Sequence, residues 1–245
     1  MIYFLKRSLP FLLLFLACRD INDKTAEEII NKSIEVSGFN TNEIDITFDF
    51  RAYHYEFFRK DFYFTYARTT IKDDKKIRDE MSSSKGLKRF IDSVPESLTD
   101  SLAVVYSNSL NSVMYFFQLP KPLLDDAVHS ELLGEIKIEE GTYWTIKVSF
   151  SQEGGGEDYQ DKYRYWINQD TYEIDYLAYN YAAEGGGIRF RKAINKKRIK
   201  GILFQDYKNF RPLNKYELLD DLPQIYEEGL LSQISLIENK NIIVQ

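Results

Sequence analysis

Segments in which every second residue is apolar recur along this chain, and they constrain its fold more than any other feature. Residues 44–50 alternate in this way, and residues 142–150 repeat the pattern, with Trp144 and Phe150 on the apolar face. A period of two places alternate side chains on opposite faces of a β-strand. Aromatic residues make up 15% of the chain and favour such half-buried strands. The sequence therefore predicts a protein built mainly from antiparallel strands.

The same pattern predicts where the other strands and their connections lie. The apolar phase slips after Phe50 onto Tyr53, which predicts a β-bulge near Ala52. The charged and serine-rich stretch 73–85 predicts a loop. Further strands are predicted at residues 62–71 (the hairpin partner of the preceding strand), 87–91, 162–168, 173–183, 187–195, 199–208 and 232–238.

Two helices are predicted beside these strands. Thr25 and Glu28 form a capping-box pattern at the start of residues 26–37, and Gly38 follows as a C-cap. The second helix covers residues 99–117. Its apolar face, which is expected to lie on the sheet, consists of Leu102, Val105, Tyr106, Leu110, Val113 and Phe117.

Together these elements predict an α+β fold in which a curved antiparallel β-sheet, a half-barrel-like meander, packs against a few helices. The sequence shows no linker, and its six prolines and 12 glycines are too few for a low-complexity chain. Residues 25–245 are therefore expected to form a single domain, whose length suffices for a sizeable core.

The amino terminus has the pattern of an export signal. Lys6 and Arg7 precede an apolar run at residues 9–17, which as a helix would rise only about 13 Å against roughly 30 Å of hydrocarbon. Such a run indicates a cleavable signal peptide, residues 1–17, rather than a transmembrane helix. An ordinary cut after residue 17 would put the bulky Phe15 at position −3, whereas the small residue before Cys18 is typical of a lipobox.

Cys18 is the only cysteine, so the chain can form no internal disulfide. We expect its thiol to carry a lipid, with residues 18–24 as the lipidated tether. The alternatives are a buried structural cysteine and an uncleaved signal anchor.

Charge bears on the partners of the mature chain. Removal of residues 1–17 changes the formal net charge from −6 to −8, and the chain has no run rich in Lys and Arg. Nucleic acid is therefore not an expected partner. An acidic body also gains nothing from an anionic lipid surface, so the anchor rather than the folded body is expected to hold the membrane. The predicted location is the cell envelope, lipid-anchored and facing the periplasm, with the outer membrane favoured over the inner and the protein a monomer.

Motifs for catalysis or metal binding are missing from the sequence. His54 and His129 belong to no zinc-binding pattern, and no Gly-x-Ser-x-Gly element is present. We therefore expect a non-enzymatic protein with no metal and no cofactor. Acidic Glu157, Asp158 and Asp161 could hold calcium, but an exposed acidic loop is the favoured interpretation.

Two segments, residues 153–156 and 184–187, each consist of a glutamate followed by three glycines and lie beside a predicted strand. Their bare backbone amides could approach a ligand, but hairpin turns or strand kinks are the favoured interpretation. Arg189 and Arg191 share one face of a strand. They are expected to pair with a lipid headgroup or with Asp158 and Asp161 if that face is concave, and to be surface charge if it is not.

The aromatic stripes allow two interpretations. Each apolar residue could simply belong to the core, or the stripes could line a hollow between the curved sheet and its helices. The candidate lining residues of such a hollow are Phe48, Phe50, Trp144, Ile146, Phe150, Arg189 and Arg191.

Five segments resemble a family of uncharacterised bacterial envelope lipoproteins: SVMYFFQLP (112–120), YWI (165–167), DYLAY (175–179), GGIRFRKAIN (186–195) and GILFQDYKN (201–209). The likeness covers nearly the whole mature chain. This family in turn is similar in architecture to the lipoprotein carriers LolA and LolB, which implies a curved antiparallel sheet closed by helices around an apolar cavity for acyl chains. Fold alone does not fix function, and the resemblance implies no catalytic residues.

The leading hypothesis is accordingly a membrane-anchored, non-enzymatic protein that binds a lipid or another hydrophobic ligand in a sheet–helix cavity. The alternative is a scaffold or accessory lipoprotein that binds another envelope protein and holds no small ligand. A filled interior would favour the second hypothesis.

Overall fold

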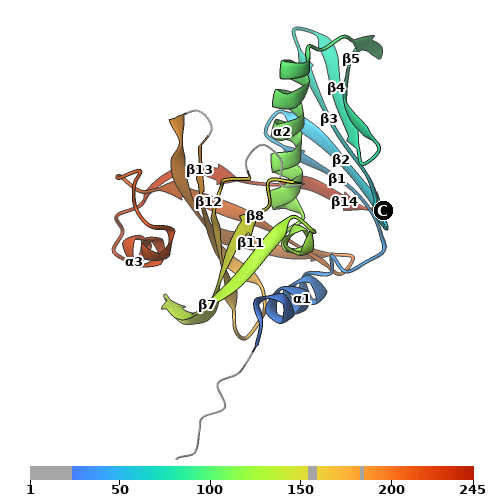
Figure 1. The fold of residues 1–245 in the computed structure, drawn as a ribbon. Coiled ribbons are helices and arrows are strands. Elements are labelled where there is room, and N and C mark those ends of the chain that lie inside the picture. Colours follow the sequence, from blue (N-terminus) through green and yellow to red (C-terminus); the bar gives the residue numbers. More distant parts are fainter. Residues whose placement is uncertain (1–23, 154–158, 183–184) are drawn as a thin grey trace, which may run out of the picture.

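The computed structural model describes residues 24–153, 159–182 and 185–245 of the chain. Figure 1 shows the arrangement of the elements. In chain order they are α1 (Ala26–Ser37), β1 (Glu43–Phe50), β2 (Tyr53–Lys60), β3 (Tyr63–Lys72), β4 (Lys75–Ser82), β5 (Lys85–Ile91), β6 (Val94–Glu96), α2 (Asp100–Phe117), η1 (Lys121–Leu124), β7 (Val128–Ile138), β8 (Gly141–Phe150), β9 (Tyr163–Asn168), β10 (Ile174–Tyr181), β11 (Gly187–Ile199), β12 (Ile202–Arg211), η3 (Leu219–Asp221), α3 (Leu222–Glu227), β13 (Ser232–Ile237) and β14 (Lys240–Val244).

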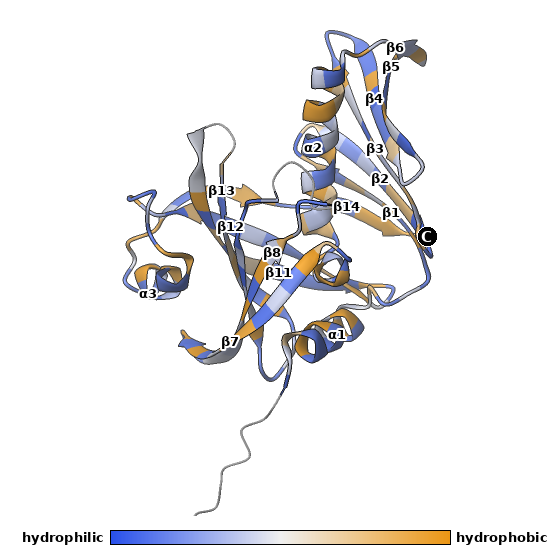
Figure 2. Ribbon diagram, viewed as in Figure 1, coloured by the Kyte–Doolittle hydropathy of each residue, from blue (hydrophilic) through white to orange (hydrophobic). Residues whose placement is uncertain are grey.

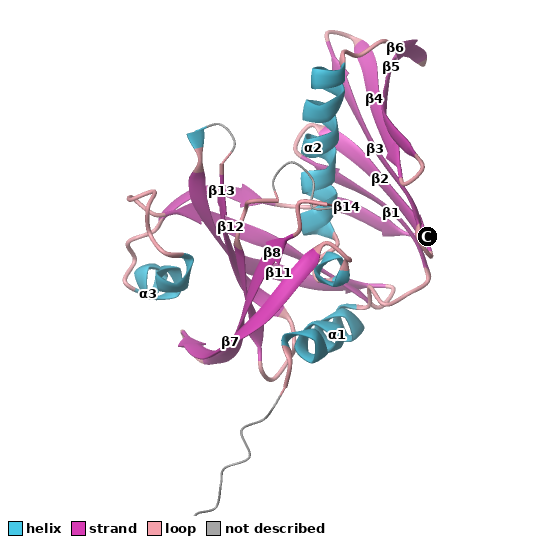
Figure 3. Cartoon of the chain, viewed as in Figure 1, coloured by secondary structure: helices cyan, strands magenta, loops and turns pink. Residues whose placement is uncertain are grey.

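The strands form two antiparallel seven-stranded sheets (Figure 3). Sheet A has the order β14-β1-β2-β3-β4-β5-β6, and sheet B has the order β13-β12-β11-β10-β9-β8-β7. Residues 238 and 239 are all that separates β13, at the edge of sheet B, from β14, at the edge of sheet A. The chain therefore links the two sheets edge to edge, and the fold is a strongly bent, open layer, as the α+β prediction of a half-barrel-like meander requires.

Helix α1 forms where the sequence predicts it and for the predicted reasons. The hydroxyl of Thr25 accepts a hydrogen bond from the backbone N–H of Glu28, and the Glu28 side chain accepts one in return from the backbone of Thr25. Gly38 ends the helix with a φ of 79°. A Cβ atom at this position would lie 2.5 Å from the carbonyl oxygen of Gly201, so glycine permits both the left-handed cap and the close contact of α1 with the β11–β12 turn.

Helix α2 packs along sheet A, and its C-terminal end points toward sheet B (Figure 1). Its buried residues are Leu110, Met114 and Phe117. The predicted apolar face is wrong over the first turns, where Leu102 and Val105 are exposed. The first half of α2 is instead held to sheet A by polar contacts from Arg68 and Arg89.

Three apolar clusters fill the interior. One lies between α1 and sheet B, a second lies between α2 and sheet A, and a third lies on the other face of sheet B. Sheet B is thus covered on both faces, which explains why Tyr165 and Trp166, neighbours in β9, are both fully buried. In Figure 2 helix α1 carries hydrophobic residues beside hydrophilic ones, as expected of a helix with one buried face.

Two predictions about connections are wrong. The stretch 73–85 contains strand β4 rather than a single loop, with the tight turn Asp73–Asp74 before it, where both residues have positive φ. No bulge is found near Ala52, because Arg51 and Ala52 form the turn of a hairpin in which Phe50 pairs with Tyr53. Strands β7 and β14 and helix α3 were not predicted.

Candidate functional site

The candidate cavity residues divide into two groups. Phe48 stacks on Phe117 of α2, with ring centroids 3.8 Å apart, and is fully buried. Trp144 and Ile146 belong to the cluster beneath α1. Phe150 packs edge-on against two tyrosines of that cluster. These four side chains are therefore packed in the core and do not line a cavity.

The other three predicted residues, Phe50, Arg189 and Arg191, meet at a pocket of about 450 Å³. The pocket lies where α2, the end of β1 and strands β10 to β13 come together. Among the described residues, its lining consists of Phe50, Arg51, Ser109, Ser112, Val113, Phe116, Phe117, Tyr179, Arg189, Arg191, Tyr207, Asn209, Ile234, Ser235, Ile237 and Asn239. We call it the junction pocket, because it lies where the chain passes from sheet B to sheet A.

The fold explains why this space stays open. Helix α1 covers the part of sheet B around Trp144, whereas α2 leans on sheet A through its buried residues. Between them, Val113 and Phe116 of α2 face strands of sheet B across the pocket. The bend between the two sheets therefore leaves a hollow that neither helix fills.

The polar side of the junction pocket lies on sheet B. Arg191 Nη2 donates a hydrogen bond to Tyr179 Oη at 2.8 Å, and its guanidinium carbon lies 3.9 Å from the ring centroid of Phe116. Arg189 donates to Tyr181 Oη and, at 2.9 Å, to the backbone carbonyl of Ile188. Both arginines thus have neutral partners in the described part of the chain.

Tyr207 contributes an uncharged phenol to the same wall. Burial raises the pKa of its hydroxyl group above the ordinary tyrosine value, so the group stays protonated at neutral pH. Its oxygen accepts a hydrogen bond of 2.7 Å from Gln205 Nε2. Gln205 lines the small cavity beside the pocket rather than the junction pocket itself, so the hydroxyl group of Tyr207 is held on the side of that cavity.

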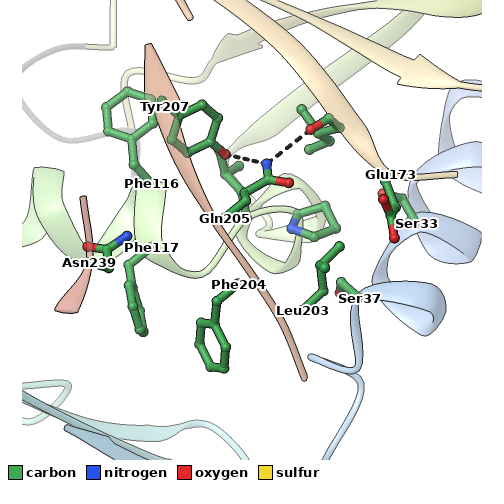
Figure 4. Close-up of a pocket in the computed structure, with 13 residues that line it drawn as sticks. Ser33, Ser37, Phe116, Phe117, Glu173, Leu203, Phe204, Gln205, Tyr207 and Asn239 are labelled. Atoms are coloured by element: carbon green, nitrogen blue, oxygen red, sulfur yellow. Dashed lines mark hydrogen bonds between the residues drawn. The ribbon is translucent and has the colours of Figure 1, made fainter. Parts of the chain in front are cut away.

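A second cavity adjoins the junction pocket and shares Phe116, Phe117, Tyr207 and Asn239 with it (Figure 4). Its volume is about 30 Å³, roughly that of one water molecule in the liquid. The figure shows Gln205 reaching across it toward Tyr207. This cavity is too small for an acyl chain, so the junction pocket is the candidate site.

Several lining residues could not be found from the sequence. Val113 and Phe117 were assigned only to the helix face on the sheet, and Ser109 and Ser112 had no expected role. Ile234 and Ile237 were predicted only as part of a strand. Phe116 sits beside Phe117 in a helix, and such adjacent aromatics cannot both face one sheet, which is the one sequence signal that pointed to a second surface.

The other candidate sites gain no support. Asp158 and most of the glycine run 153–156 lie outside the described residues, and Glu184 does too. Asp161 is buried, with 6% of its surface exposed, and is therefore not part of an exposed acidic loop. Gly185 and Gly186 take φ values of 85° and 74° in the connection from β10 to β11 and also line an open hollow of about 480 Å³.

Among residues 24–153, 159–182 and 185–245, no group of three or more His, Cys, Asp or Glu side chains is placed to hold a metal ion. Over the same residues, no helix is long and apolar enough to cross a membrane. Cys18 and the predicted signal peptide lie outside the described residues.

The fold is LolA-like. A LolA superfamily protein from Nitrosomonas europaea superposes with a TM-score of 0.52 at 14% sequence identity, over 91% of this chain and 94% of that one. A DUF1329 family protein from Desulfovibrio piger gives a TM-score of 0.43 at 11% identity, over 89% of this chain and 92% of that one. The fold assignment rests on the first of these.

Residues 6–239 match a family described as "Family of unknown function (DUF6503)", and the chain belongs to it. No curated protein matches the sequence. The predicted LolA-like fold is therefore confirmed. The predicted membership of a family without an assigned function is confirmed as well.

Proposed function

We propose that this protein is a membrane-anchored envelope lipoprotein that binds a lipid or another hydrophobic ligand in the junction pocket and catalyses no reaction. One observation carries the proposal: the two sheets and α2 leave a pocket of about 450 Å³ between them. Ligand pockets in proteins typically measure about 300–1,000 Å³.

The chemistry of the wall supports a ligand with a long apolar part. Six of its lining side chains are aromatic or aliphatic and come from β1, α2 and β13: Phe50, Val113, Phe116, Phe117, Ile234 and Ile237. Each methylene group that leaves water for such a wall contributes about 0.8 kcal/mol. An acyl chain can therefore bind by burial alone, with no covalent step.

Lipid binding is tested on the full chain, purified from the membrane fraction in a detergent that native mass spectrometry removes. We expect the wild-type protein to carry lipid-sized mass adducts. Val113→Trp places a large side chain in the pocket and should reduce them. The matched control is Val105→Trp on the same helix, where the valine is 58% exposed and lies outside the pocket.

The control and the wild type should then bind equally. Overpacking typically costs about 1–3 kcal/mol, so circular dichroism must show that Val113→Trp is still folded. Repeated absence of lipid from the wild-type protein would contradict the proposal and favour a scaffold that binds another envelope protein.

We also propose that residues 1–17 are removed as a signal peptide, that residues 18–24 form a tether lipidated at Cys18, and that residues 25–245 form one domain. The anchored protein then faces the periplasm, on the outer membrane in preference to the inner, as a monomer. Support comes from the short apolar run before the single cysteine. Cys18→Ser should abolish incorporation of labelled palmitate and release the protein from the membrane fraction; a variant that stays bound indicates an uncleaved anchor.

A further inference from the structure

The charged side chains of the junction pocket are all of one sign. Arg51, Arg189 and Arg191 line it, and among the described lining residues there is no aspartate or glutamate. Arginine is rarely buried unless it is paired with an acid. A pocket with three guanidinium groups and no lining carboxylate is therefore suited to a ligand that brings the negative charge itself.

Arg191 makes this argument specific. Arg191 is only 8% exposed, and its Nε has no hydrogen-bond partner among the described residues. An unsatisfied buried donor costs free energy, more so on a charged group. The contact with Phe116 and the hydrogen bond to Tyr179 fix the plane of the guanidinium group but leave the Nε–H unused.

A second unused polar atom lies on the neighbouring strand. Asn209 pairs with Arg191 across β11 and β12 and is also 8% exposed. Its Nδ2 donates to Ser235 Oγ at 3.0 Å, but its Oδ1 has no partner. Both residues line the junction pocket. The wall of the pocket thus holds a buried charged donor and a buried neutral acceptor at paired positions of β11 and β12, and neither has a partner among the described residues.

Nearby acids do not provide the missing charge. Glu173 and Asp175 both pair with Lys196, and Glu173 also pairs with Arg198. Asp206 accepts hydrogen bonds from Asn195 and from the backbone of Asn239. These carboxylates are engaged outside the junction pocket, so Arg189 and Arg191 do not compete for them.

We infer that the ligand of the junction pocket is an anionic amphiphile, whose oxyanion is held by Arg191 together with Arg189 while its apolar chain lies against Phe116 and Phe117. The inference rests on the proposed function, because it names the chemical class of the ligand in the same pocket. The shared chemistry is a carboxylate or phosphate attached to an acyl chain. Guanidinium groups bind both kinds of oxyanion through paired N–H groups.

The test offers delipidated full-length protein two ligands at once and measures the bound fractions by native mass spectrometry. The first mixture is equimolar palmitate and 1-palmitoylglycerol, which carry the same chain with a charged and an uncharged head. The second replaces palmitate by 1-palmitoyl lysophosphatidate. We expect the wild type to prefer the anionic lipid by about tenfold or more, the factor that a hydrogen bond to a charged group provides.

Arg191→Gln should bring the ratio of bound anionic to bound neutral lipid close to one without abolishing binding of 1-palmitoylglycerol. Arg191→Lys should keep part of the preference, since lysine retains the positive charge but not the paired N–H groups of the guanidinium. Arg211→Gln, at an exposed arginine on β12 outside the pocket, is the matched control and should behave as the wild type. If Arg191→Gln fails to fold, Arg189→Gln provides the same comparison.

Equal binding of anionic and neutral lipids by the wild type would overturn the inference and leave the proposed function standing. Binding of neither lipid would overturn both. The stronger of palmitate and lysophosphatidate identifies the headgroup as a carboxylate or a phosphate. Inorganic phosphate or acetate that competes with the lipid at equal concentration would also overturn the inference, because the apolar chain would then contribute nothing.

Discussion

Replacement of Asp79 by asparagine should destabilise the protein more than any other single change to a polar residue of sheet A. Asp79 lies in β4 with 2% of its side chain exposed. Its Oδ2 accepts hydrogen bonds of 2.9 Å from both Arg68 and Arg89, and its Oδ1 accepts one of 2.7 Å from Arg89. One carboxylate thus forms ion pairs with two guanidinium groups at the interface with α2.

The magnitude follows from what the substitution leaves behind. Asparagine keeps the shape but removes the charge, so Arg68, which is also buried, loses its counterion. Loss of one partner from a buried pair costs about 3–5 kcal/mol, which for a chain of this length lowers Tm by about 6–20 °C. Arg68 also donates to Ser109 at 2.8 Å, and Arg89 lies 3.5 Å from the ring centroid of Tyr106. The substitution should therefore also weaken the packing of α2 against sheet A.

Urea unfolding followed by tryptophan fluorescence measures the free energy, and hydrogen exchange measures the protection of α2. Glu43→Gln is the control, because it breaks the exposed Lys60–Glu43 pair and should leave the free energy of unfolding nearly unchanged. If Asp79→Asn costs no more than this control, or if α2 exchanges as slowly as in the wild type, the ion pairs do not hold the helix and the reasoning is refuted.

Two more predictions concern stability. Phe48→Ala should cost about 3–5 kcal/mol in urea unfolding, because Phe48 is fully buried against Phe117; a cost below about 1 kcal/mol would mean that Phe48 borders open space. The hydrogen bond from Arg78 lowers the pKa of Glu56 below its ordinary 4.5, so its stabilisation is complete above that pH and is lost as pH falls through the lowered pKa. Since this pair is partly exposed, we expect it to contribute less than about 1 kcal/mol to the free energy of unfolding. The stability of Glu56→Gln should therefore fall less between pH 6 and pH 3 than that of the wild type. Equal pH profiles for the two proteins would contradict this prediction.

Strand β4 shows where the prediction of strands from alternating apolar residues fails. Its inward face carries Ile77, Asp79 and Met81, so a charged residue occupies the centre of the stripe. Asp79 is tolerated there because arginines from β3 and β5 reach it. Those strands are separate in sequence, and the pairing exists only after the sheet forms. When the buried face of a strand depends on ion pairs, its sequence therefore predicts a charged loop instead of a strand.

The candidate site shows the same limit. Trp144 and Arg191 have the same status in the sequence, since each lies on one face of an alternating strand. The first is covered by α1 and the second borders the junction pocket. Which of them lines a hollow depends on where the two helices dock, and docking depends on residues far apart in the chain. Alternation grouped the residues that share a face of each strand but could not say which part of that face remains open.

Chain length connects the proposed anchor to the folded domain. From Cys18 to Lys24, where the described structure begins, six residue steps span at most about 20 Å. Lys24 is already fixed to the domain, because its ammonium group lies 4.6 Å from the ring centroid of Trp144 and donates to Tyr172 Oη at 2.7 Å. If Cys18 carries the anchor, Lys24 therefore stays within about 20 Å of the bilayer that holds it.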